Sequence, residues 1–216
     1  VLDYINDFIE PDITTNYLND LCHQFIIENN AIPAPLNYKG FPKSTCISVN
    51  HVVCHGIPGD KILKDGDILN IDITVILDEW HGDTSRMFFI GKKSIKSEKL
   101  VEVTFSSMWE GIKKVKPGNT ADDVAQAFWK VLDKYGIQKT SRTGYSIGIG
   151  YPPDWGEHTL NIYKGDMTIL EPNVCFHMIA VMQFGNWGVE SSEAVRVTEK
   201  GCELFCKFSR ELHIKG

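Results

Sequence analysis

The chain has no surplus of positive charge, no long apolar run and no CxxC cysteine pair. It has 216 residues, a net charge of −6 and a pI of about 5.6. This balance argues against a nucleic-acid groove or an anionic membrane surface as partner, because both select Lys and Arg patches. The longest apolar runs are only of strand length, so no transmembrane helix is expected. The six cysteines include no CxxC pair and predict reduced thiols in a cytoplasmic protein.

The sequence also lacks repeats, low-complexity tracts and a recognisable signal peptide. It begins at Val1 rather than at a methionine, so we expect that a further N-terminal segment precedes it. Hydrophobic residues make up 43% of the 216 positions, which is enough for one well-filled domain, 1–216, built from two halves. Strands mixed with a few long helices, without βαβ alternation, predict an α+β fold.

Apolar spacing predicts three helices. The first begins after Thr14, the second covers 98–115, and the third runs from Asn119 or Thr120 to Gly136, with an apolar stripe along one side. The strongest strand is expected over 67–78. Beyond residue 143, further strands are expected in MTILEP, VCFHMIAVM and SEAVRVTEKG.

Two aspartates interrupt the strongest strand signal. Asp72 lies between Ile71 and Ile73, and Asp83 follows eleven residues later. A turn at 78–79 puts both on one face of a hairpin, about 7–8 Å apart at the backbone. Asp83 can be explained as a turn residue that caps its own backbone. Strand interiors are depleted in Asp, so Asp72 favours a divalent metal held by carboxylates.

The segments KSTCISVNHVVCHGIP, GDILNIDITV and HGDTSRMFFIG closely resemble type I methionine aminopeptidases, and the resemblance runs from Val1 to Gly136. It implies the pita-bread fold, a pseudo-two-fold mixed or antiparallel sheet backed by helices, and one or two divalent ions such as Co, Mn, Fe or Zn. Asp72 and Asp83 match the family's metal ligands, and His55 matches the histidine near the scissile bond. The methionine pocket matches Tyr38, Phe41 and Cys46.

The family takes a histidine and two glutamates from its second half. The histidine position falls on Tyr145 in GYSIG. Glu171 in LEP is similar to the first glutamate, although alignment through Pro172 moves that position to Ile179. Counting back from Gly201 puts the second on Ser192, which lies between Glu190 and Glu193. We take Glu171, also as a catalytic residue, and Glu193 as the expected ligands, with Glu190 as the alternative to Glu193.

The segment from Arg142 to Gly201 resembles ectoine hydrolases, a creatinase-like branch of the same fold, through TGYSIGIGYPPDWGEHT, FHMI and WGVESSEAVRVTEKG. The expected halves are therefore 1–136, similar to aminopeptidases, and 142–216, similar to ectoine hydrolases. His158 and Trp187 are candidate substrate contacts. His177 stands between Phe176 and Met178 on an expected strand, so we favour a core or interface position for it.

Three hypotheses follow. The first is a metal-dependent aminopeptidase that removes N-terminal methionine from peptides or nascent proteins. It would associate with ribosomes, and neither DNA nor a membrane is an expected partner. The second is a metal-independent C–N hydrolase for a small cyclic amide or amidine, as in ectoine hydrolases. The third is a hybrid that keeps the fold as a binding module without catalysis.

Overall fold

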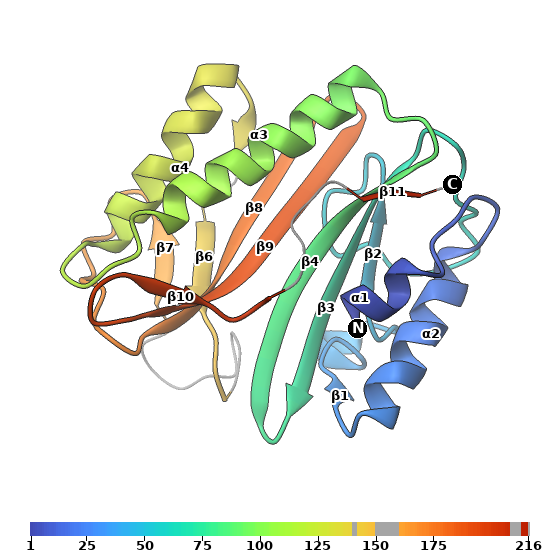
Figure 1. The fold of residues 1–216 in the computed structure, drawn as a ribbon, viewed down its shortest axis with the longest axis horizontal. Coiled ribbons are helices and arrows are strands. Elements are labelled where there is room, and N and C mark those ends of the chain that lie inside the picture. Colours follow the sequence, from blue (N-terminus) through green and yellow to red (C-terminus); the bar gives the residue numbers. More distant parts are fainter. Residues whose placement is uncertain (140–141, 150–159, 208–212, 216) are drawn as a thin grey trace.

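The computed structural model describes residues 1–139, 142–149, 160–207 and 213–215. Its strands form two sheets that meet along β4 (Trp80–Ile90) and β9 (Trp187–Val197) near the middle of the molecule (Figure 1). Helices α1 (Leu2–Asn6) and α2 (Thr15–Glu28) lie beside the first sheet. The expected mixture of helices and strands is thus arranged in two sheet-and-helix halves.

The first sheet is built on the long hairpin of β3 (Ile68–Leu77) and β4. Strands β1 (Ile32–Pro33) and β2 (Cys46–Val49) both pair antiparallel with β3. Strand β11 (His213–Lys215) pairs parallel with β4 and closes the other edge. The sheet is therefore mixed, with only its C-terminal strand running parallel to its neighbour.

The second sheet is antiparallel and is built on the hairpin of β8 (Cys175–Phe184) and β9. Its order is β10-β9-β8-β6-β7, and β5 also pairs with β8. The remaining strands are short: β5 (Gln138–Lys139), β6 (Arg142–Ser146), β7 (Asn161–Tyr163) and β10 (Cys202–Leu204). The expected strand in MTILEP is not formed, and Ile169 makes only an isolated bridge to Thr120.

The three predicted helices are confirmed, although the one expected over 98–115 begins and ends three residues earlier. Thr14 caps α2, and its side chain accepts a hydrogen bond from the Tyr17 amide. Helix α3 (Ile95–Ile112) begins three residues before Glu98, because Ser94 provides the cap. Helix α4 (Ala121–Tyr135) has a capping box at Thr120 and ends at Gly136, whose φ of 61° favours glycine.

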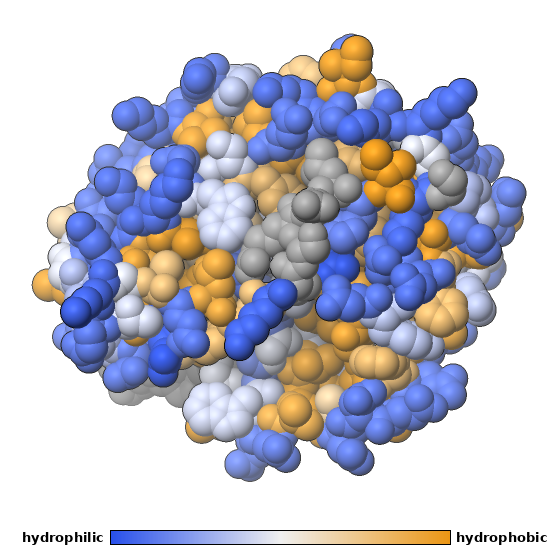
Figure 2. Space-filling model, viewed as in Figure 1, coloured by the Kyte–Doolittle hydropathy of each residue, from blue (hydrophilic) through white to orange (hydrophobic). Residues whose placement is uncertain are grey.

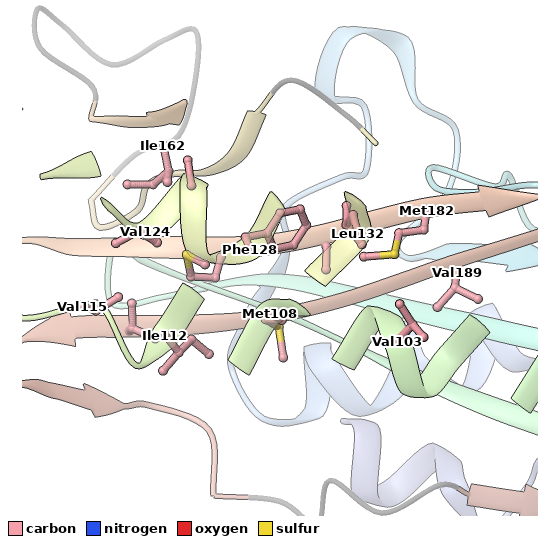
Figure 3. Packing of buried hydrophobic residues seen from close by; sticks show 14 of the residues in the cluster. Val103, Met108, Ile112, Val115, Val124, Phe128, Leu132, Ile162, Met182 and Val189 are labelled. Carbon is pink, nitrogen blue, oxygen red and sulfur yellow. The ribbon is translucent and has the colours of Figure 1, made fainter. Parts of the chain in front are cut away.

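The larger core lies between the second sheet and helices α3 and α4 (Figure 3). Met108 of α3 and Phe128 of α4 pack there with Met182 of β8 and Val189 of β9, and all four are at most 2% exposed. Figure 2 shows hydrophilic residues widely spread over one face, with smaller exposed hydrophobic areas between them. Within the described residues, no helix is long and apolar enough to cross a membrane.

Hydrogen bonds tie the two sheets together beside the central strands. The Ser192 hydroxyl of β9 donates to the Ser85 hydroxyl of β4 at 2.9 Å. The Asn70 side-chain amide of β3 donates to the Glu190 carbonyl of β9 at 3.1 Å. All four residues are buried. These bonds set the position of β9 relative to the β3–β4 hairpin, so residues from both halves can face one site.

Candidate active site

The β3–β4 hairpin presents two carboxylates on one face, as its sequence predicts. Residues Asp78 and Glu79 form the turn, both with positive φ, and Thr74 lies opposite Asp83. Asp72 has the same strand parity as Thr74, so its side chain lies on the face of Asp83. The two aspartates are only 8% and 5% exposed. A turn-capping role at the surface does not describe Asp83, which lies four residues past the turn and is buried.

A third carboxylate comes from the other half of the chain. Glu190 of β9 is 1% exposed and lines the same cavity as the two aspartates. Among the described residues, no hydrogen-bond partner exists for Asp72 Oδ1, Asp83 Oδ1 or Glu190 Oε2, which are all buried. Buried polar atoms normally have partners, so these three oxygens indicate a missing positive group.

Burial and mutual repulsion shift the protonation of this cluster. Burial raises the pKa of the Asp72 carboxyl well above its usual value, and the charges of Glu190 and Asp83 and a hydrogen bond with Asp83 raise it further. Burial, followed by the charge of Asp83, raises the pKa of the Glu190 carboxyl to about 8. A cation between the carboxylates would reverse both shifts, because it favours their charged forms.

Two aromatic rings from the second sheet complete the polar floor. Tyr145 of β6 lies directly opposite His177 of β8, and the ring centroids are 5.2 Å apart. The Tyr145 hydroxyl donates to Asp83 Oδ2 at 3.1 Å, and His177 Nδ1 donates to the Asp83 carbonyl at 3.2 Å. His177 is buried, as expected, but it lines the cavity and does not belong to the apolar core. Of the expected core or interface position, the burial is observed, while Phe176 and Met178 point to the opposite face, toward the core.

The cavity above this floor has a volume of about 930 Å³. The expected pocket residues Tyr38, Phe41 and Cys46 line it, and so does His55, which is expected near the scissile bond. Cys46 lies opposite Asp72 in the sheet, and burial raises the pKa of its thiol, so it is a neutral packing group there. All six cysteines carry free thiols.

Local backbone geometry holds His55 at the cavity wall. His55 has a φ of 54°, and the following Gly56 packs against β2. The Gly56 amide donates to the Ser48 hydroxyl, and its carbonyl accepts from the Ile47 amide. A Cβ at position 56 would lie 2.3 Å from the Ile47 carbonyl oxygen, so only glycine allows this approach.

Several expected site residues lie elsewhere. Glu171 is exposed and is not among the cavity residues. Glu193 is buried on the opposite face of β9, the face on which Val189 and Val195 join the core. Trp187 packs against that core at the start of β9. His158 lies outside the described residues.

Glu190 and His177 are the residues whose place the sequence did not reveal. Strand parity offers a signal for Glu190, because it lies two residues from Ser192 and therefore on the same face of β9. Ser192 and Ile179 are directly opposed in the β8–β9 pairing. The register through Pro172 would give the first glutamate position to Ile179 and the count from Gly201 would give the second to Ser192, whereas the LEP dipeptide would give the first to Glu171.

Comparison with known proteins identifies the family. The model of metallopeptidase family M24 matches residues 1–199. The chain belongs to metallopeptidase family M24. Methionine aminopeptidase from Rickettsia prowazekii (strain Madrid E) is 56% identical over 148 residues, which cover 68% of this chain and 57% of that protein. Methionine aminopeptidase from Salmonella typhimurium is 40% identical over 94% of this chain and 85% of its own length.

Solved structures give the same family and fold. The crystal structure of methionine aminopeptidase from Rickettsia prowazekii has a TM-score of 0.87 and 42% identity, and the match covers 94% of this chain and 90% of that one. Methionine aminopeptidase from Thermotoga maritima, at 22% identity and a TM-score of 0.84, shares the fold. The pita-bread fold is therefore confirmed, and the family to which the chain belongs uses divalent metals.

The donors in this cavity fit a divalent ion in their chemistry. Among the described residues, no three His, Cys, Asp or Glu side chains are arranged as a ready-made metal site. Without a cation the cluster keeps protons instead, because burial raises the pKa values of Asp72 and Glu190 and a hydrogen bond joins Asp72 to Asp83. The buried oxygens without partners and the raised pKa values point to a cation, and carboxylate oxygens suit ions such as Mn²⁺.

Proposed function

We propose that this chain is a metal-dependent aminopeptidase that removes an N-terminal methionine from peptides and nascent proteins. The observation that carries the proposal is the buried trio Asp72, Asp83 and Glu190 beneath a cavity whose wall includes Tyr38 and Phe41. A flexible thioether side chain suits such an apolar wall. The carboxylates attract the positively charged N-terminus of a peptide, which brings the first peptide bond to them.

Asp72, Asp83 and Glu190 would hold the ion. When bound, a divalent ion polarises the scissile carbonyl and lowers the pKa of a water molecule. Peptide hydrolysis adds the hydroxyl of water to the carbonyl carbon and a proton to the leaving nitrogen. The Glu190 carboxylate would also take that proton and pass it on. His55 would donate a hydrogen bond to the carbonyl oxygen as negative charge develops there.

We propose one ion per chain. The opposed pair Ile179 and Ser192 replaces the two glutamates that family register assigns to these positions, and Tyr145 replaces a histidine. A phenol is a weaker ligand than an imidazole at neutral pH. Fewer strong donors lower the number and the affinity of metal sites. Comparison of Mn²⁺, Co²⁺, Fe²⁺ and Zn²⁺ in the assay described next would identify the ion.

The test is an assay of a Met-Ala-Ser peptide by the metal-stripped full chain after each ion is added. We expect methionine release with at least one ion and loss of release with EDTA. A Leu-Ala-Ser peptide tests the side-chain pocket, and an N-acetylated Met-Ala-Ser peptide tests the need for a free amine. Absence of turnover with every ion would overturn the proposal.

A second candidate function is metal-independent hydrolysis of a small cyclic amidine, as the resemblance of the second half to ectoine hydrolases implies. The observation that favours it is the Tyr145 hydroxyl, which satisfies one oxygen of Asp83 without a metal. Ectoine opening in EDTA would support this function. Peptide turnover that requires metal, without ectoine opening, would remove it.

The free thiols favour a cytoplasmic location, where nascent proteins supply N-terminal methionine. Association with ribosomes is part of this proposal. Cosedimentation of the chain with ribosomes at physiological salt would test it, with free peptide substrate as competitor.

A further inference from the structure

The histidine ligand that the family resemblance places on β6 is absent here, but a histidine lies beside that position on the neighbouring strand β8. Position 145 carries a tyrosine, and the residue directly opposite on β8 is His177. Strands β6 and β8 lie side by side in the second sheet (Figure 1). Directly opposed residues of an antiparallel pair project to the same face of the sheet. His177 therefore reaches the cavity from a position adjacent to the one it would replace.

Hydrogen bonding fixes which ring nitrogen of His177 is free to bind. The Asp83 carbonyl can only accept a hydrogen bond, so the proton of the neutral ring lies on Nδ1, 3.2 Å away. The lone pair then lies on Nε2. Among the described residues, no hydrogen bond to Nε2 is formed, although the side chain lines the cavity. A neutral imidazole nitrogen with a lone pair, on a side chain that lines a cavity together with carboxylates, can bind a cation.

The surroundings of the ring match those of metal-binding histidines. Such a histidine almost always donates its other ring N–H to a carboxylate, a backbone carbonyl or water, which fixes its tautomer and orientation. Here the acceptor is the carbonyl of Asp83, and Nδ1 also lies 3.7 Å from Asp83 Oδ2. The Tyr145 hydroxyl holds that same carboxylate oxygen. Tyr145 thus orients Asp83, while His177 offers the nitrogen.

We propose that His177 Nε2 is the nitrogen ligand of this chain's metal ion, supplied from β8 in place of an imidazole on β6, and that Tyr145 is a positioning residue for Asp83. This inference rests on the proposed metal-dependent function and adds a ligand that family register does not assign. It predicts a mixed site of carboxylate oxygens and one imidazole, which suits Co²⁺, Mn²⁺, Fe²⁺ or Zn²⁺ better than an all-oxygen site.

The test uses the metal-stripped full chain and Co²⁺ alone, followed by visible absorption and calorimetry. His177→Asn keeps an amide donor near the position of Nδ1 and removes Nε2. We expect it to bind Co²⁺ at least about tenfold more weakly, since loss of even an outer partner of a ligand costs that much. His177→Gln, which keeps a polar atom near the position of Nε2, is the second variant. His55→Asn removes the other described imidazole of the cavity and is the matched control.

A direct readout comes from pulsed electron paramagnetic resonance of the native protein loaded with Mn²⁺. We expect ¹⁴N modulation from a bound imidazole, which is lost in His177→Asn and kept in His55→Asn. Adding Tyr145→His to His177→Asn should restore nitrogen coupling and part of the affinity, because the two positions are opposed. The native spectrum tests the inference even if a variant does not fold.

The outcomes separate this inference from the proposed function. Metal-dependent turnover with no nitrogen coupling, or with unchanged Co²⁺ affinity in a folded His177→Asn, would overturn the inference and leave the function. A native chain that binds neither ion and has no metal-dependent turnover would overturn both.

Discussion

The two long hairpins of this molecule have the same lengths and different chemistry. Strands β3 and β8 each have 10 residues, and β4 and β9 each have 11. On the β3–β4 hairpin, Asp72 and Asp83 face the cavity where the motifs predict ligands. On the β8–β9 hairpin, Ile179 and Ser192 lie directly opposite each other, at the positions that alignment through Pro172 and the count from Gly201 would give to glutamates.

The donors of the second hairpin lie two residues away from those positions. His177 precedes Ile179 by two residues, and Glu190 precedes Ser192 by two, so all four side chains lie on one face of the hairpin, and His177, Ile179 and Glu190 line the cavity. A shift of one residue would have turned a donor toward the helices, where Glu193 lies. In a pleated strand only every second residue faces the cavity. The comparison therefore teaches that a metal-binding side chain can move along a strand only in steps of two residues if the strand pairing stays the same.

The largest expected effect comes from the first hairpin. Asp83→Asn removes the carboxylate that contacts both Tyr145 and His177. We expect kcat/KM for Met-Ala-Ser to fall by more than about 100-fold, because loss of an outer partner alone costs 10–100-fold. Asp78→Asn at the exposed turn is the matched control and should change kcat/KM less than about twofold. Equal activities for the two variants would contradict the proposed site.

The second hairpin offers a matched pair of glutamates. Glu190→Gln removes a cavity carboxylate, and we expect about 10–100-fold weaker Mn²⁺ binding by calorimetry. Glu193→Gln alters a residue on the opposite face and should change that affinity less than about twofold. A larger loss of Mn²⁺ affinity in Glu193→Gln than in Glu190→Gln would indicate that Glu193, and not Glu190, binds the ion.

The pH dependence of stability distinguishes a metal-free carboxylate cluster from a filled one. Burial raises the pKa of Glu190 from its unfolded value near 4.5 to about 8, so the folded chain holds a proton that the unfolded chain has released. The stability of the metal-free protein should therefore fall as pH rises from about 5 to 8. We expect a lower Tm at pH 8 than at pH 5, and a smaller fall in Glu190→Gln.

Saturating Mn²⁺ should also reduce this fall in Tm, because the ion favours the charged carboxylates and binds the folded state. Calorimetry of the native chain and Glu190→Gln with and without Mn²⁺ gives the comparison. A Tm of the metal-free native chain that rises steadily from pH 5 to 8, equally in the variant, would contradict the cluster.

The smallest effect is expected at Tyr145. Tyr145→Phe removes the hydroxyl that donates to Asp83 Oδ2, and we expect the free energy of unfolding to fall by about 0.5–1.5 kcal/mol. Metal affinity should change by only a few-fold, because the phenol positions Asp83 and does not bind the ion. Loss of metal binding as large as in Asp83→Asn would make Tyr145 itself a ligand.

Local signals in the sequence predict much of the fold. The caps at Thr14, Thr120 and Gly136 place two helices correctly, because each cap satisfies backbone groups within its own turn. The two-residue period of a strand and the position of the turn give the face of Asp72 and its relation to Asp83. The start of α3 was missed by three residues because Ser94 caps it earlier than the apolar pattern begins.

The second half of the site depends on long-range packing and was less predictable. Neighbours Phe176 and Met178 made His177 resemble a core residue, yet adjacent strand residues point to opposite faces. Glu193 is nearer in sequence to the expected motif than Glu190, but of the two only Glu190 lies on the strand face that lines the cavity. Glu171 matches a family dipeptide and lies outside the cavity. Sequence proximity to a motif does not give the face of a strand.

The most direct test of this account is calorimetric titration of the metal-stripped native chain with Mn²⁺ at pH 7.5. The account predicts one bound ion per chain, held by Asp72, Asp83 and Glu190 with His177. Two ions of equal affinity would contradict the single site, and absence of binding up to millimolar Mn²⁺ would contradict the metal site altogether.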